Sequence, residues 1–493
     1  MDQPTQSILS LFEMISSIPR SSKHEERIAS WLKEWALSHG LSFKSDSVNN
    51  VMITVPPSVG YESSPTVVIQ GHMDMVCEKI ESCPHDFSCD PIKLVYDGDW
   101  LRADGTTLGA DNGIALAIAL ELAQDPDIKH PPLELLFTVD EETSMQGASA
   151  LAPDFISGQI FLNLDSEEEG VFIAGCAGGV TTTTEIELER VPVPYSYGIC
   201  KLVAEGLAGG HSGVDIHEKR ANSNKMLATA IDRLMRFKDA HLKDTHFKDP
   251  GILLISADGG KAHNAIPRYS QAILAYPVDS LPQMESTIAQ LESELRSEYA
   301  ERETGLTLRL EKIHKEEALQ AIAPEITTKL LGLLLDLPHG VVSMSAAMPD
   351  RVETSSNLAV TKTTQDKFTI VTSQRSSDMG RLEELTGRIG SMAGSAGGAV
   401  HNSEGYPAWK PDMASPLLRK CEDVYESTFG KKPEVEVIHA GLECAIIGSK
   451  FVDLDMISFG PTIKNPHSPD ERLYIPSVSR TWEFFVALLA SFR

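Results

Sequence analysis

Acidic and histidine side chains stand directly after apolar runs in this sequence. His72 and Asp74 follow the run TVVIQG, and their spacing of two points both side chains to the same side of an extended chain. A metal-ligating imidazole needs an acceptor on its second ring nitrogen, and a carboxylate commonly provides it. The pair therefore fits a metal ligand with its orienting partner. Taken alone, it also fits a surface histidine beside a solvated aspartate.

The same arrangement recurs twice further along the chain. Glu141 and Glu142 come soon after the apolar run LELLFTV, and Asp165 ends the run IFLNLD. Successive side chains of an extended chain point to opposite sides, so one glutamate can ligate a metal while the other transfers protons. A solvated strand edge is the less favoured alternative for this pair.

Two further candidates are expected in loops. Asp111 lies between glycines in LGADNG, at the start of an apolar helix predicted from about residue 112 to 123. A helix N-cap is the ordinary role for such an aspartate, but the flanking glycines also let the backbone approach an ion closely. His467 lies in the loop GPTIKNPHSPDERL, with Glu471 four residues later.

The apolar runs before these groups predict buried strands, and the segments between them predict helices. Such an alternation indicates a mostly parallel α/β sheet, and sites in these folds lie at the carboxyl edge of the sheet. Residues 5–18 and 23–39 are predicted to be amphipathic helices that cover the sheet. We therefore expect the candidate residues to gather at one edge.

The pattern changes near residue 197. Strands and helices predicted between residues 199 and 312 follow the order β-α-β-β-α-β of a ferredoxin-like unit. A less complete second round follows up to residue 391, so the sequence predicts an enlarged or doubled α+β insertion. Small residues at 391–400 predict a return linker. The expected division is 1–196 and 396–493 for the two parts of the main domain and 197–395 for the insertion.

Composition narrows the class of protein. The 493 residues include 43 Lys plus Arg and 70 Asp plus Glu, and the net charge of -27 disfavours binding to nucleic acid or to anionic membranes. No apolar run of about 18 residues and no signal peptide is evident, so we expect a cytoplasmic protein. Seven cysteines without a CxxC pattern indicate reduced thiols, although the even spacing of Cys77, Cys83 and Cys89 leaves a thiolate metal cluster as a weaker alternative.

The candidate residues suggest metal chemistry when they are taken together. They comprise two imidazoles and four carboxylates: His72, Asp111, Glu141, Glu142, Asp165 and His467. This set exceeds the needs of one tetrahedral zinc ion and fits two divalent ions about 3.5–4 Å apart that share a carboxylate and a water. Five groups can serve as ligands, and the remaining carboxylate can act as general base. Zinc is expected, although such ligands also accept manganese or cobalt.

An ordered set of short motifs resembles one known family. GHMDMV, LGADNG, VDEET, NLD, GGHSG, HNAIP and HSPDE together resemble the M20 metallopeptidases, and most of all their aminoacyl-histidine dipeptidase branch, also called peptidase D or cytosol non-specific dipeptidase. The resemblance covers essentially the whole chain. It implies a di-zinc peptidase domain with an inserted lid, activity on unblocked dipeptides of the Xaa-His type and broader, and a homodimer.

The resemblance also implies a role for each matching residue. His72 and Asp165 are expected to bind one zinc ion, Glu142 and His467 the other, and Asp111 both. Asp74 is expected to orient His72, and Glu141 to be the base that activates water.

Further roles are implied for the insertion and for the segment that follows it. His211 is expected to stabilise the oxyanion, from this chain or from a partner subunit. Asn264, Arg375 and Gly441 match positions that contact the substrate backbone or carboxylate. The segment HAGLEC departs from the glycine-threonine version of many relatives, and we expect its Glu443 to receive the free ammonium of a dipeptide.

Two other functions are compatible with the same residues. One is an amidohydrolase of the same architecture that acts on N-acyl amino acids or, as a carboxypeptidase, releases a carboxyl-terminal residue. The other is a catalytically silent metal-binding scaffold. The presence of Glu141 argues against the silent scaffold, because a protein without activity would be free to lose its base.

Overall fold

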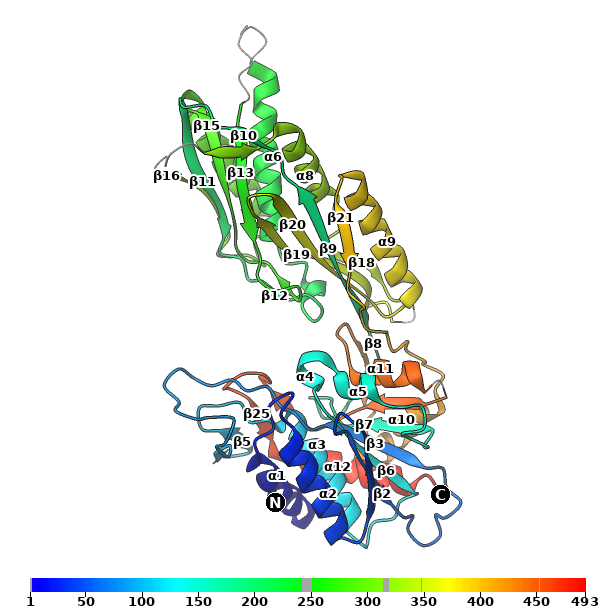
Figure 1. Cartoon of the computed structure of the whole chain (residues 1–493). Helices are drawn as coiled ribbons and strands as arrows, with labels where there is room; N and C mark the ends of the chain where they lie inside the picture. The colour runs from blue at the N-terminus through cyan, green and yellow to red at the C-terminus, as the bar shows by residue number, and fades with distance from the viewer. Residues whose placement is uncertain (1, 242–250, 314–318, 347, 452) are drawn as a thin grey trace. The chain divides into compact units, whose positions relative to one another are not determined.

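The computed structural model describes residues 2–241, 251–313, 319–346, 348–451 and 453–493 (Figure 1). It divides into two compact units. Unit 1 comprises Met1–Cys176, Trp409–Ile438 and Leu442–Arg493, and unit 2 comprises Ala177–Ala408 and His439–Gly441.

Unit 1 is built on an eight-stranded mixed sheet. Its strands, in spatial order, are β1 (Ser42–Ser45), β2 (Val51–Val55), β6 (Leu133–Thr138), β3 (Val67–His72), β7 (Ile160–Asn163), β23 (Asp455–Ser458), β8 (Val171–Cys176) and β22 (Glu434–Ile438). The four strands from β6 to β23 are mutually parallel. By contrast, β1 and β2 extend the sheet in antiparallel fashion. The predicted parallel arrangement is thus found at the centre of the sheet.

Helices cover both faces of this sheet. One face packs against α1 (Gln3–Ser16), α2 (Glu26–Ser38), α3 (Ala110–Gln124), α10 (Pro416–Phe429) and α12 (Ile475–Ala490). The other packs against α5 (Gln146–Ala150) and α11 (Glu443–Lys450). Along β3, Val67 and Ile69 join the first core and Val68 joins the second, because successive side chains of a strand alternate between faces. The central strands are therefore buried on both sides, as their continuous apolar sequences predict.

The carboxyl ends of the parallel strands carry the candidate residues. His72 is the last residue of β3, the short helix α4 (Glu141–Ser144) follows β6, and Asp165 follows β7. A four-stranded antiparallel sheet contributes His467. It contains β24 (Ile463–Lys464), β25 (Arg472–Tyr474), β5 (Trp100–Ala103) and β4 (Leu94–Asp97), and His467 lies between β24 and β25. Strands β4 and β5 form a hairpin in which Asp97 pairs with Trp100.

Unit 2 is built on a nine-stranded sheet. Its main path is β16 (Thr307–Ile313), β11 (Tyr197–Glu205), β15 (Ser270–Pro277), β13 (Leu253–Gly259), β19 (Val352–Thr363), β20 (Lys367–Ser376), β9 (Gly178–Glu187) and β21 (Ala399–Asn402), and β18 (Gly340–Met344) pairs with β19. Four helices share a core with this sheet: α6 (Ser223–His241), α7 (Leu281–Glu298), α8 (Pro324–Asp336) and α9 (Met379–Ser395).

The two halves of this sheet have the same strand order. When the strands of each half are counted along the chain, the order from the edge of the sheet to its centre is fourth, first, third, second. In the first half these strands are β16-β11-β15-β13, and in the second they are β21-β9-β20-β19. Between β13 and β19 the strand ladder contains one pair, Gly259 with Thr361. A separate ribbon joins β10 (Arg190–Pro192), which precedes the first half, to β17 (Gln320–Ile322), which follows it, and here Arg190 pairs with Ile322.

The limits of unit 2 differ from the insertion predicted at 197–395. Strand β9 precedes residue 197, yet it pairs with β20 along its whole length, and β21 pairs with β9 on the other side. The predicted linker at 391–400 contains the last turn of α9 and the start of β21. Threonines dominate β9 and small residues dominate the end of α9, so neither segment has the apolar run that marks a buried element. No helix among the described residues is long and apolar enough to cross a membrane.

Candidate functional site

Asp111 joins two groups of potential ligands in unit 1. Its Oδ1 lies 3.1 Å from Nε2 of His72, and its Oδ2 lies 3.1 Å from Nε2 of His467. The first group is completed by Asp165, whose Oδ1 is 3.3 Å from the same nitrogen of His72. Glu142 completes the second, with its Oε2 3.0 Å from Nε2 of His467. The ligand atoms of each group lie within 4.8 Å of one another.

The local backbone explains why Asp111 is available for this role. Asp111 has the non-helical angles φ -78° and ψ 104°, so the regular part of α3 begins after it. The expected alternative, a capping aspartate, is not what the structure contains, because the side chain of Asp111 makes its hydrogen bonds to His72 and His467. These bonds hold the pKa of Asp111 below its ordinary value despite its burial.

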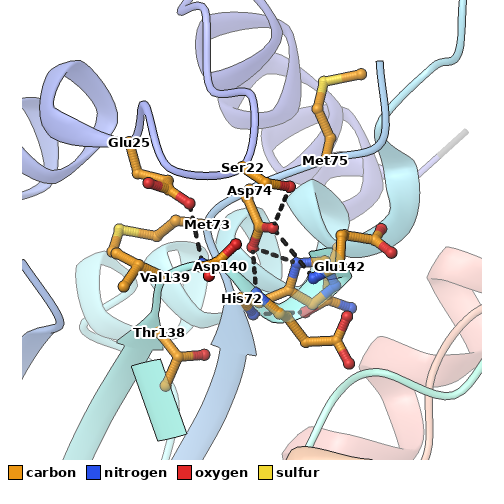
Figure 2. A network of polar contacts seen from close by, with 12 residues as sticks. Ser22, Glu25, His72, Met73, Asp74, Met75, Thr138, Val139, Asp140 and Glu142 are labelled. Atoms are coloured by element: carbon orange, nitrogen blue, oxygen red, sulfur yellow. Dashed lines mark hydrogen bonds and ion pairs between the residues drawn. The ribbon is translucent and has the colours of Figure 1, made fainter. Parts of the chain in front are cut away.

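Asp74 lies at the centre of a polar network next to His72 (Figure 2). Its Oδ1 is 3.2 Å from Nδ1 of His72 and accepts a hydrogen bond from the backbone N–H of Glu141 at 3.0 Å. Its Oδ2 accepts bonds from the hydroxyl of Ser22 at 2.8 Å and from the N–H of Glu142 at 3.2 Å. One fully buried carboxylate thus orients the imidazole of His72 and anchors the start of α4.

The pKa values of the acids reflect their crowding. Burial raises the pKa of Glu141 well above its ordinary value, and the nearby Asp165 and Glu142 raise it further. Burial likewise raises the pKa of Asp165 to about 6. Hydrogen bonds with Asp111 and Glu142 raise the pKa of His467 to about 11. Carboxylates placed so close together favour bound cations, either protons or metal ions.

The loop before Asp111 is held by a group that the sequence analysis noted without assigning a role. Glu471 is buried, and its carboxylate accepts hydrogen bonds from the backbone N–H groups of Leu108 at 2.7 Å, Gly109 at 2.9 Å and Asp111 at 3.3 Å. The guanidinium of Arg20 binds the same loop and donates a hydrogen bond to the carbonyl of Gly109. The segment IPRSS that contains Arg20 offered no pattern that would have marked it.

In unit 2, His211 has a defined tautomer. It ends the short strand β12 (Gly210–His211), which pairs with β14 (Ala265–Ile266). Its Nδ1 accepts hydrogen bonds from the backbone N–H groups of Gly213 at 3.3 Å and Val214 at 3.1 Å. A ring nitrogen that accepts such bonds carries no hydrogen, so Nε2 carries it and can act as a donor.

His439 lies close to His211 and Arg375 in the same unit, although it was not among the predicted site residues. Arg375 is buried, and its Nη1 donates to the hydroxyl of Tyr406 at 2.6 Å. The hydroxyl of Ser355 lies 2.7 Å from Nε2 of His439. Burial, with the charges of Arg375 and His211, lowers the pKa of His439 to about 3, so its ring is neutral. Its position in the segment HAGLEC, between a strand and a helix, was the available signal.

The remaining predicted residues lie elsewhere. Asn264 is exposed, and its carbonyl accepts a bond from the N–H of Ser212. Gly441 lies in the turn before α11. Glu443 is fully buried and accepts hydrogen bonds from Gln70 at 2.6 Å and Thr138 at 2.7 Å. Both bonds end on Oε2, whereas Oε1 of Glu443 has no hydrogen-bond partner among the described residues, so the contact of Glu443 with a substrate ammonium stays a prediction.

The donor set in unit 1 fits two divalent cations. Each group combines one imidazole with carboxylates, which are ligands that zinc, manganese and cobalt share. In addition, Oε1 of Glu142 is buried and has no hydrogen-bond partner among the described residues. Unpaired buried oxygen is costly unless a cation or another partner satisfies it. The cysteines are all free thiols, and no ligand group found among the described residues includes one.

Comparison with known proteins decides the family. The model of peptidase family M20/M25/M40 matches residues 68–491. The chain belongs to this family. It is therefore a peptide-bond hydrolase, and the sequence resemblance to the M20 peptidases is confirmed. The match extends from β3, which carries His72, to the end of α12.

Individual relatives align with nearly the whole chain. The cytosol non-specific dipeptidase of Escherichia coli (strain K12) is 37% identical over 484 residues, which are 98% of this chain and 97% of that protein. The crystal structure of aminoacylhistidine dipeptidase from Vibrio alginolyticus matches with a TM-score of 0.86 and 38% identity, covering 98% of this chain and 96% of that one. Aminopeptidase PepT from Bacillus cereus shares the fold, with a TM-score of 0.55 and 15% identity, covering 99% of this chain and 98% of that one.

Proposed function

We propose that this peptidase hydrolyses unblocked dipeptides, those ending in histidine among them, with the aid of two divalent metal ions, most simply zinc. The observation that carries the proposal is the placement of Asp111, whose two oxygens face two different histidines at 3.1 Å each. A carboxylate shared in this way suits a pair of ions. The names of two relatives that match over nearly their whole length, a non-specific dipeptidase and an aminoacylhistidine dipeptidase, support the substrate class.

Each ion has its own protein ligands in this proposal. His72 and Asp165 would hold the first ion, Glu142 and His467 would hold the second, and Asp111 would serve both. When bound, the two ions would supply Lewis acidity towards the scissile carbonyl and would lower the pKa of the attacking water. Asp74 keeps Nδ1 of His72 protonated, which leaves Nε2 to face its ion.

Glu141 is the proposed general base. Its carboxylate lies within 4.8 Å of ligand atoms of His72 and Glu142, and it is the one carboxylate of the set that the two proposed pairs do not require. Its backbone N–H is fixed by Asp74, so the side chain starts from an anchored position. As the base, Glu141 takes a proton from the attacking water and passes it to the leaving amine.

Residues of unit 2 are proposed to bind the substrate. The N–H at Nε2 of His211 is a suitable donor for the oxyanion that forms on the scissile carbonyl. Arg375 provides a guanidinium for a substrate carboxylate, and its Nε is buried without a hydrogen-bond partner among the described residues. The repeated strand order of unit 2 supports a doubled lid. Asn264 and Gly441 remain candidates for contacts with the substrate backbone.

The deciding experiment compares three substrates on the zinc-loaded protein. These are a free dipeptide ending in histidine, the same dipeptide with an acetylated amino group, and a tripeptide. Cleavage of the free dipeptide alone, abolished in Glu141→Ala, is the expected result. Cleavage of the acetylated compound would instead establish an acylase or carboxypeptidase. A protein that binds two metal ions and cleaves none of the three would be a silent scaffold.

Two further properties belong to this proposal. We infer a cytoplasmic location, supported by the free thiols and by the name of the Escherichia coli relative. A homodimer is the second, and it remains a prediction. Light scattering of the purified protein tests it directly, since a monomer has a mass of 53.7 kDa.

A further inference from the structure

Arg20 is a buried cation in unit 1 that the proposed mechanism does not use. Only 2% of its surface is exposed. Its Nη1 donates to the carbonyls of Met73 at 2.9 Å and Asp74 at 2.8 Å, and its Nη2 donates to the carbonyl of Gly109 at 2.5 Å. These carbonyls belong to two separate segments: the one that follows β3 and the one that precedes Asp111. Arg20 thus ties together the backbones that carry His72 and Asp111.

Glu471 binds the same loop from the chain segment of His467. Its three hydrogen bonds engage N–H groups of residues 108, 109 and 111, whereas Arg20 engages the carbonyl of residue 109. Glu471 is also the charge that most strongly offsets the burial of Arg20. The two side chains thus hold the loop through its carbonyl and its N–H groups, and a buried backbone group that loses such a partner is left unsatisfied at a cost in stability.

Two glycines of the LGADNG motif make room for the guanidinium. A Cβ atom on Gly109 would come within 2.5 Å of Nη2 of Arg20, and one on Gly113 within 2.7 Å of the same atom. Gly109 also has φ of +66°, a conformation that favours glycine. The sequence suggested that these glycines admit an ion, but the group that approaches them is the side chain of Arg20.

We propose that Arg20 and Glu471 form a positioning pair that holds the loop of residues 108–111 and thereby sets the spacing of the two metal-binding groups. Three segments meet at this pair: the end of β3, the irregular start of α3 with the residues before it, and the loop between β24 and β25. They carry His72, Asp111 and His467 respectively. Neither member of the pair is a predicted ligand. The inference rests on the proposed function, since it assigns these residues a role towards the metal ions.

The test compares Glu471→Gln with a matched control, Glu134→Gln. Glu134 is a buried carboxylate near the start of β6, at the opposite end of that strand from the site, and it accepts bonds from the N–H groups of Ser157 and Gly158. Both substitutions replace one carboxylate oxygen by an amide nitrogen that cannot accept a backbone N–H bond. Only the first is next to the metal-binding loop.

Two readouts are needed. The first is peptide-level hydrogen exchange of the metal-free protein over residues 105–113. The second is binding of cobalt(II), followed by its visible spectrum in competition with a chelator. We expect Glu471→Gln to accelerate hydrogen exchange in this segment, to lower the affinity for at least one cobalt ion by 10-fold or more, and to change the visible spectrum. Glu134→Gln is expected to leave all three unchanged while losing similar thermal stability.

The outcomes separate this inference from the proposed function. Wild-type exchange rates or wild-type cobalt affinity in Glu471→Gln would each overturn the positioning role. If the wild-type protein itself bound no cobalt, the metal part of the proposed function would fail, and exchange alone would decide whether the pair holds the loop. Should Glu471→Gln not fold, Arg20→Lys and Arg20→Met replace it. Partial recovery of cobalt affinity in the lysine variant relative to methionine is expected, and equal affinities would refute the proposal.

Discussion

Replacing Asp74 with asparagine should weaken both the fold and the metal site. Four donors converge on the two oxygens of Asp74: Nδ1 of His72, the hydroxyl of Ser22, and the N–H groups of Glu141 and Glu142. An asparagine has one carbonyl oxygen, so its NH₂ group must face one pair of these donors. If the NH₂ group faces Ser22, the hydroxyl of Ser22 can accept a hydrogen bond from it, so only the N–H of Glu142 is left unpaired. An unpaired buried donor costs about 1–3 kcal/mol of unfolding free energy.

The effect on metal binding follows from the same geometry. Loss of the negative partner of a ligating histidine typically lowers metal affinity by about 10- to 100-fold. The expected change is therefore roughly 1.4–2.7 kcal/mol in the binding of the ion held by His72. Zinc titration in competition with a chelator measures the affinity, and denaturant unfolding of the metal-free protein measures the stability.

Asp455→Asn is the matched control. Asp455 starts β23 and accepts bonds from the hydroxyl of Ser415 at 2.5 Å and from the N–H of Leu417 at 2.9 Å, at the edge of the sheet opposite the site. Its replacement should lower stability without changing zinc affinity. If Asp74→Asn bound zinc as tightly as Asp455→Asn does, the assignment of Asp74 as the group that orients His72 would be wrong.

Three other predictions address the base and the response to pH. Glu141→Gln should lower kcat about 10²- to 10⁴-fold while two zinc ions remain bound, as turnover and metal analysis would reveal; retained turnover would exclude it as the base. In metal-free protein, the folded-state pKa values of Asp165, about 6, and Glu443, about 7, exceed the ordinary values of 3.8 and 4.5. Stability should therefore fall as pH rises from about 4 through 7, by up to about 1.4 kcal/mol per pH unit for each group, and melting curves in chelator that stay level would contradict this. For His439, the folded-state pKa of about 3 lies below the ordinary 6.5, so unit 2 should lose stability as pH falls below 6.5. Hydrogen exchange of unit 2 at pH 7 and pH 5 measures the loss, and His439→Gln should lessen it.

The candidate ligands could be predicted because each follows a recognisable element. His72 and Asp165 come at the ends of apolar runs, and parallel strands bring their carboxyl ends to one edge whatever the details of packing. Asp111 was marked by its glycines. The structure brings these residues together as the sequence analysis expected, because strand ends and a helix start are local features.

The supporting contacts could not be predicted in the same way. Arg20 binds main-chain carbonyls 53, 54 and 89 residues away, and any residue type supplies a carbonyl, so no sequence pattern records the contact. Glu443 begins a helix after a loop, which suggests exposure, yet the pairing of Gln70 and Thr138 with it depends on the packing of α11 against the sheet. The boundaries of unit 2 were missed because threonine-rich β9 is half buried and lacks an apolar run.

The ribbon of β10 and β17 gives unit 2 a modular construction. The chain enters the first half of the sheet after Arg190 and leaves it before Ile322, and these two residues are partners in the ribbon. The strands of such a pair are about 5 Å apart, so entry and exit of the intervening segment coincide. The second half, by contrast, takes β9 from before that segment and β19, β20 and β21 from after it. The first half is therefore a cassette inserted within the second, and it is joined to its host by the ribbon, by the pair of Gly259 with Thr361, and by an apolar core to which both α6 and β19 contribute.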